Sequence, residues 1–291
     1  MQDFISRCTS LNIPAEKYGR RLIWHDEFNR EKIDEEKWTF FRSMNCENRI
    51  YNNDTRHARI ENSNLQLQIY REDDGKYSLP EGLATKETML FKYGYVEMRA
   101  KIPFRHCAWP SFWMLGNTPF HNEKIGWFAE IDIFEVFSSE NLLIPNLHKW
   151  GKAGHEMLTG SENDIVRAYQ FKNNKTLNDE YHIYGFEWDA HEVKFFVDNE
   201  CYYHFLIGEN SGFTSAVYPD TGGFHEPLYI IINNEMFTKE SEWYPCGSAA
   251  TAEDSMPINY CVDWVRLYQN PETESIYLKN DISEAEIFKK S

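Results

Sequence analysis

Short runs of alternating apolar and polar residues recur along this chain, and they constrain its fold more than any other feature. Such runs stand at residues 64–69 (Asn-Leu-Gln-Leu-Gln-Ile), 95–102 and 191–197. A period of two places apolar side chains on one face of a β-strand and polar side chains on the other. Many short strands, separated by polar turns and with few helical stretches, predict an all-β sandwich of two antiparallel sheets.

The chain has 291 residues, which exceeds one average domain. All-β sandwiches nevertheless reach ~250 residues as single units. We therefore expect an N-terminal leader segment at residues 1–20, one sandwich domain at residues 21–270 and a C-terminal tail at residues 271–291. The tail is charged, and residues 282–289 predict a short helix packed on the outside of the domain.

The composition excludes several classes of partner. A net charge of −16 argues against nucleic acid, and no stretch approaches the ~20 apolar residues of a membrane span. The first residues lack the basic start and apolar run of a signal peptide. The protein is therefore expected in the cytoplasm as written, or outside the cell if a leader has been removed. We expect a monomer whose six scattered cysteines are free thiols.

Residues 127–137 read Trp-Phe-Ala-Glu-Ile-Asp-Ile-Phe-Glu-Val-Phe and contain three carboxylates, at Glu130, Asp132 and Glu135. The aromatic and β-branched residues around them indicate a strand. Glu130 and Asp132 would share one face of it, whereas strict alternation would bury Glu135 in the core at a high cost. A β-bulge at about Phe134 returns Glu135 to the face of the other two. We therefore predict three acids on one face of one bulged strand.

Three interpretations of this acidic segment stay open. Neighbouring carboxylates push one another's pKa values apart, so that one keeps its proton while another is ionised. A glycosidase needs such a pair. A solvated sheet face would also be rich in acids, and a Glu-x-Asp pair could bind a metal. No histidine or cysteine lies within the segment to complete a transition-metal site.

Two tryptophans lie just before the acidic segment. Trp109 and Trp113 are four positions apart with Pro110 between them, which argues against a helix interior and places both on one face of a strand. Indole rings commonly cover the apolar C–H face of a sugar, although either residue alone could belong to the core. Because the acidic strand follows after a short connection, we predict that the two indoles form a wall beside the acids.

Residues 130–135, Glu-Ile-Asp-Ile-Phe-Glu, resemble the E-x-D-x-x-E active-site strand of glycoside hydrolase family 16 in its bulged form. Further segments resemble the family in the same order, at residues 24–28 with 33–38, 91–101, 181–188 with 196–198, and 262–268. The resemblance covers residues 22–270. It implies a two-sheet β-jelly-roll sandwich with a concave carbohydrate-binding cleft. It also implies retaining endo-hydrolysis of a β-linked polysaccharide by double displacement, with no cofactor required.

The resemblance assigns a role to each acid. Glu130 would be the nucleophile, Glu135 the general acid and then the general base, and Asp132 the group that bonds to the nucleophile and keeps the other charges apart. His148, in Asn-Leu-His-Lys-Trp, resembles the family's cleft histidine on the next strand, with a structural histidine as the alternative. Trp150 would be a further sugar platform.

Three further acids and one altered motif complete the comparison. Glu47 resembles an early-loop acid that bonds a sugar hydroxyl, and an ordinary loop acid is the alternative. Glu27 and Asp263 match positions near the family's structural ion, so a calcium site is an expectation there. Members that cleave β-1,3-glucan usually carry Asn-Leu-Ala-Val-Gly-Gly where this chain has Asn-Asn-Glu-Met, which places Glu235 near the substrate.

The expected substrate is a β-1,3- or mixed-linkage glucan, and the altered motif weakens that expectation. A β-galactan such as agar, porphyran or a mucin-type glycan is the alternative. A relative that only binds glycan, or one that transfers the cleaved sugar to another sugar, also stays open. The presence of all three acids argues against a protein that only binds.

Overall fold

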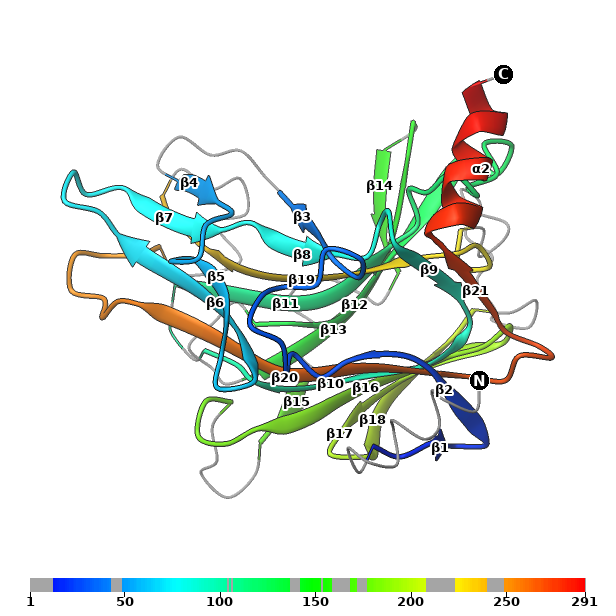
Figure 1. The fold of residues 1–291 in the computed structure, drawn as a ribbon, viewed down its shortest axis with the longest axis horizontal. Helices are drawn as coiled ribbons and strands as arrows, with labels where there is room; N and C mark the ends of the chain where they lie inside the picture. The colour runs from blue at the N-terminus through cyan, green and yellow to red at the C-terminus, as the bar shows by residue number, and fades with distance from the viewer. Residues whose placement is uncertain are drawn as a thin grey trace.

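The structure is a computed structural model. It describes residues 13–42, 49–103, 105, 107–136, 142–152, 154–158, 168–171, 177–207, 223–239 and 249–290. Within these ranges the chain forms two large β-sheets that stack face to face, with one C-terminal helix beside them (Figure 1). No helix in the described ranges is long and apolar enough to cross a membrane. The prediction of an all-β sandwich is confirmed.

The larger sheet has 11 strands among the described residues. In spatial order its main strands are β18 (Glu200–Leu206), β17 (Glu192–Val197), β16 (His182–Trp188), β10 (Gly94–Lys101), β20 (Ile258–Gln269), β6 (Asn64–Arg71), β7 (Tyr77–Pro80) and β4 (Arg49–Asn52). Three more strands pair alongside them, namely β1 (Glu16–Lys17), β2 (Arg20–Asp26) and β5 (Ala58–Glu61). The strands pair antiparallel, except that β4 and β7 are parallel.

The smaller sheet has eight strands among the described residues, and all pair antiparallel. Its main strands in spatial order are β14 (Gly154–Met157), β13 (Leu142–Gly151), β12 (Trp127–Glu135), β11 (Ala108–Leu115), β19 (Tyr229–Met236), β8 (Gly82–Ala84) and β3 (Thr39–Phe41). A short strand, β15 (Tyr169–Gln170), pairs with β13.

The hydrophobic core lies between the two sheets. Val96 and Met98 of β10 are fully buried, and so are Phe112 of β11, Ile131 of β12 and Leu147 of β13, all in one cluster. These residues alternate with polar ones along their strands, as the sequence predicts. The residues between them in the eight-stranded sheet must therefore point away from the core. We call that side of the sheet the outer face.

The C-terminal tail packs on this outer face. Its strand β21 (Ser275–Leu278) pairs with β9 (Met89–Lys92), and helix α2 (Lys279–Lys290) begins three residues before the predicted start (Figure 1). The side chain of Ile282 is only 3% exposed and clusters with Tyr229 and Ile231 of β19. Since Ile230 and Ile232 face the core, Tyr229 and Ile231 lie on the outer face. The tail thus pairs by its backbone with β9 in a separate two-stranded sheet, and its helix contacts the eight-stranded sheet through apolar side chains.

Candidate active site

The three acids Glu130, Asp132 and Glu135 lie on β12, which carries a β-bulge. Asp132 pairs with Trp113 of β11 and Glu135 with Ser111, so three steps along β12 match two along its neighbour. The same shift appears toward β13. The extra residue turns both Ile133 and Phe134 to the core, where they are 2% and 1% exposed. The bulge prediction is confirmed, and the three acids lie on the outer face.

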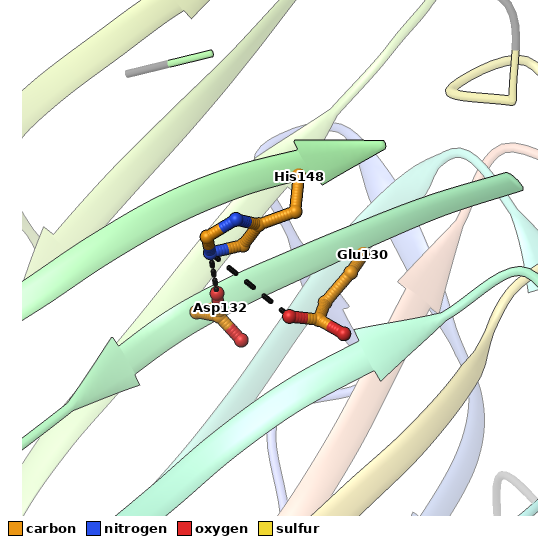
Figure 2. A group of neighbouring side chains, drawn as sticks. All are labelled: Glu130, Asp132 and His148. Atoms are coloured by element: carbon orange, nitrogen blue, oxygen red, sulfur yellow. Dashed lines mark ion pairs between the residues drawn. The ribbon is translucent and has the colours of Figure 1, made fainter. Parts of the chain in front are cut away.

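Glu130 is held by two side chains of the next strand. The indole Nε1 of Trp150 donates a hydrogen bond to Glu130 Oε2 at 3.0 Å. His148 lies directly across from Glu130 in the pairing of β12 and β13. Figure 2 shows its Nε2 facing both acids, 3.1 Å from Asp132 Oδ2 and 3.9 Å from Glu130 Oε1. His148 and Trp150 therefore lie beside the acids. That His148 lines the cleft for sugar and that Trp150 is a sugar platform stay predictions.

Glu135 has different partners. The indole Nε1 of Trp109 donates to its Oε1 and the amide Nδ2 of Asn146 donates to its Oε2, each at 2.9 Å. Both carboxyl oxygens thus accept a hydrogen bond from a neutral group. A neutral donor does not fix the charge of its partner as an arginine would. Glu135 can therefore gain and lose a proton without breaking an ion pair.

The acids share a buried, negatively charged environment. Burial, and after it the charge of Asp132, raises the pKa of Glu130 and the pKa of Glu135 to about 8. His148 and the indole of Trp150 act on the pKa of Glu130 in the opposite direction. Burial and mutual repulsion thus favour the protonated form of both glutamates, and because the groups are coupled the two pKa values belong to the cluster.

The cluster in Figure 2 also has the spacing of an ion site. Glu130, Asp132 and His148 each offer one ligand atom, and these atoms lie within 4.8 Å of one another. His148 supplies from β13 the nitrogen that the acidic segment itself lacks. Glu130, however, is bound to Trp150 through its other oxygen, and an ion on this carboxylate would compete with its use as a nucleophile. If the cluster binds a metal that the protein needs, a chelator should abolish activity. If Glu130 is a nucleophile, a chelator should leave the activity unchanged.

Trp109 and Trp113 both lie on β11 and are half-buried. One face of Trp109 stacks on Phe237, with ring centroids 4.8 Å apart and planes 6° apart. The indole Nε1 of Trp113 donates to Asn233 Oδ1 at 2.7 Å. Trp113 pairs with Asp132 across β11 and β12, and Trp109 bonds to Glu135, so both tryptophans are neighbours of the acids. That they contact sugar stays a prediction.

Glu235 is buried, at 3% exposure, on β19 beside Trp109. Its Oε2 accepts hydrogen bonds from Arg49 Nη1 at 3.0 Å and from the Tyr51 hydroxyl at 2.9 Å. The charge that the sequence places near the substrate is thus neutralised within the protein. Contact of Glu235 with substrate stays a prediction, and Glu47 lies outside the described residues.

Glu27 and Asp263, the residues expected near a calcium ion, each face an arginine. The guanidinium of Arg266 donates to both carboxyl oxygens of Glu27, at 2.9 and 2.7 Å, and Arg99 pairs with Asp263. Calcium binds oxygen ligands that are not already neutralised by a cation. As they are arranged, these two carboxylates do not fit a calcium site.

Sequence reasoning missed two polar neighbours of the acids. Asn146 stands two residues before His148 on β13, so the same alternation that places His148 and Trp150 on the outer face would have found it. His155 comes from β14, an edge strand of four residues with no recognisable motif. Nothing in the local sequence marks it as a neighbour of the acids.

The sequence is similar to a family model and to several characterised proteins. Residues 24–270 match the family model described as "Beta-porphyranase A-D, GH16 domain". The chain is 26% identical over 274 residues to glucan endo-1,3-beta-glucosidase A1 of Niallia circulans, covering 86% of this chain and 38% of that protein. It is also 26% identical over 258 residues to a keratan-sulfate endo-1,4-beta-galactosidase of Sphingobacterium multivorum, covering 86% and 55%.

A similar fold occurs in a solved structure from work on endo-acting O-glycanases that the human gut microbiota express to initiate mucin breakdown. It aligns with a TM-score of 0.67 and 22% identity, over 93% of this chain and 95% of the other. At this identity the likeness concerns the fold. It supports the two-sheet sandwich described above.

Proposed function

The chain belongs to glycoside hydrolase family 16, a family of retaining endo-hydrolases, and from this we propose that it cleaves a β-linked polysaccharide internally by double displacement. The observation that carries the proposal is the bulged strand β12. It places three carboxylates on one face, two of them with raised pKa values and separate hydrogen-bond partners. Members of the family need no cofactor.

In the first step Glu130 attacks the anomeric carbon while Glu135 gives its proton to the departing glycosidic oxygen. Glu135 suits the second role because its two hydrogen-bond donors are neutral. Glu130 suits the first because His148 and Trp150 face it with N–H groups. The result is a covalent glycosyl-enzyme intermediate on Glu130.

In the second step Glu135, now ionised, takes a proton from water, and the water attacks the anomeric carbon of the intermediate. The bond to Glu130 breaks, and the product keeps the β configuration. Asp132 lies between the two glutamates along the strand and faces His148 at 3.1 Å. It holds His148 beside the nucleophile and keeps the charges of the glutamates coupled.

We propose a β-galactan as the substrate class. The family model bears a porphyranase description, and one relative is an endo-β-galactosidase. The buried pair of Glu235 and Arg49 further separates this chain from members with a small apolar motif at the same place. A β-1,3-glucan is the second candidate, because the Niallia circulans relative is an endo-1,3-β-glucosidase.

A substrate screen tests both levels of the proposal. Purified protein is incubated with agarose, porphyran, carrageenan, mucin-type glycans, laminarin and lichenan, and new reducing ends are measured. Glu130→Gln serves as the control for contaminating enzymes. We expect release from a galactan that is absent in the variant. Release from laminarin alone would replace the substrate class, and no release from any glycan would refute the activity.

Two further measurements separate the alternatives within the family. Proton NMR of the first product should show the β-anomer, whereas an α-anomer would mean inversion. Chromatographic sizing should show only products shorter than the substrate, since longer chains would indicate transglycosylation. A chelator should leave the rate unchanged, and a loss of activity restored by a divalent ion would favour a metal site at Glu130, Asp132 and His148.

A further inference from the structure

We infer that His155 is a positioning residue of the catalytic centre, acting through both side chains that hold the nucleophile. The inference rests on the proposed function, because it concerns how Glu130 is kept ready to attack. His155 contacts Trp150 and His148 of the neighbouring strand. These two side chains in turn face Glu130.

The position of His155 follows from the pairing of two strands. On β14 it lies directly across from Trp150 of β13, so its side chain shares the outer face with Trp150 and His148. Its imidazole stacks on the indole of Trp150 with ring centroids 3.8 Å apart and planes 13° apart. Its Nε2 lies 2.8 Å from Nδ1 of His148. One exposed residue thus contacts both neighbours of the nucleophile.

The contact with His155 restrains the ring of His148. Nε2 of His148 lies 3.1 Å from Oδ2 of Asp132, and its Nδ1 lies 2.8 Å from Nε2 of His155. A hydrogen bond joins the two rings whichever of these two nitrogens carries the proton. His155 thus holds the ring of His148 in the orientation that points Nε2 at the acids.

The stacking contact acts on the other partner. Trp150 donates a hydrogen bond to Glu130 at 3.0 Å. Trp150 lies on β13, between β12 and β14, and without a contact on its ring face the indole would be free to change rotamer. The imidazole of His155 covers one face of the ring and restricts that motion. Small displacements of a reacting group lower rates strongly, by about 100-fold for roughly 1 Å.

Two substitutions separate the two contacts. In His155→Gln the amide reaches about as far as Nε2 and can keep the hydrogen bond to His148, while most of the stacking is lost. In His155→Phe the ring keeps the stacking on Trp150 and loses the hydrogen bond. His155→Ala removes both contacts. His204→Ala is the matched control, because His204 is an exposed histidine on an edge strand of the other sheet.

The rates are measured on the polysaccharide identified by the screen, with kcat and KM resolved. We expect His155→Ala to lower kcat by about 10- to 100-fold with KM changed by less than about threefold, because alignment is lost and not binding. Gln and Phe should each restore part of kcat. His204→Ala should match the wild type. Circular dichroism and the thermal midpoint verify that each variant folds, which the exposure of His155 favours.

A second readout follows the indole directly. In protein labelled with ¹⁵N at tryptophan, the Nε1–H signal of Trp150, identified by its loss in Trp150→Phe, should shift in His155→Ala and not in His204→Ala. Wild-type kcat in His155→Ala would overturn the inference and leave the proposed function standing. A rise in KM alone would also overturn it, since that indicates substrate binding. An inactive wild-type protein would refute the function, and the inference with it.

Discussion

Each proposed catalytic carboxylate accepts a hydrogen bond from an indole of its own, Trp150 for Glu130 and Trp109 for Glu135. The histidine breaks this symmetry. His148 stands directly across from Glu130, whereas Glu135 stands across from Ile144. His148 nevertheless acts on the pKa of both glutamates in the same direction, and burial raises both pKa values to about 8. The register of the two strands thus places the histidine nearest to Glu130, the proposed nucleophile.

Glu130→Gln should abolish turnover while the fold stays intact, because an amide cannot form the glycosyl intermediate. Asp132→Asn should cost less, on the order of 10- to 100-fold, since Asp132 orients and does not react. Reducing-end assays on both variants and the wild type measure the difference. More than a few per cent of the wild-type rate in Glu130→Gln would refute the assignment of the nucleophile.

The pH profile of the rate should be a bell. Glu135 must be protonated in the first step, and its raised pKa of about 8 places the loss of activity on the alkaline side. Glu130 must be ionised, and its pKa is also raised to about 8. Activity therefore falls again once the pH drops below the range in which the two glutamates together hold one proton. Because the acids are coupled, each limb belongs to the cluster. Measuring kcat/KM from acid to alkaline pH gives both limbs.

Glu135→Ala assigns the alkaline limb. With an activated aryl glycoside, whose leaving group needs no proton, the first step should persist and its alkaline limb should disappear. Added azide should restore turnover by attacking the intermediate without a general base, giving a β-glycosyl azide. If the alkaline limb is still present in Glu135→Ala, the proton donor is another group.

At the level of strands, the sequence predicted what depends on alternation and on the cost of burial. The bulge follows from that cost, since without it Glu135 would lie in the core. The sequence did not predict that Arg49 neutralises Glu235, because the two residues are 186 positions apart. Likewise His155 comes from a short edge strand whose partner only the fold reveals. Contacts made by pairing of distant segments leave no local signal.

The tail should stabilise the sheet through Ile282. Replacing this buried side chain by alanine removes apolar contacts and should lower the free energy of unfolding by about 2–4 kcal/mol. Leu278, at the end of β21, is 50% exposed, so Leu278→Ala is the matched control. It should change stability by less than ~1 kcal/mol. Denaturant unfolding of the three proteins measures this, and equal midpoints would mean that α2 does not contribute.

Considered as a whole, the molecule carries a net charge of −16. A sulfated galactan is also negative, so the two repel over the length at which salt does not screen them, ~10 Å at about 0.1 M. Raising the salt from about 0.02 to 0.3 M should therefore increase kcat/KM on such a substrate several-fold. Neutral agarose is the control and should show less than about a twofold change. A fall on the sulfated substrate would reveal a local basic surface that attracts it.

The place of β20 in the larger sheet has a consequence for how the protein is made. This strand pairs with β10, β6 and β2, yet it is translated after all of them. The nascent chain therefore cannot complete the sheet until residues 258–269 have left the ribosome. Until then the apolar faces of the earlier strands lack their central partner and are exposed to aggregation. Chains truncated before residue 258 should therefore be degraded by proteases and should have no activity.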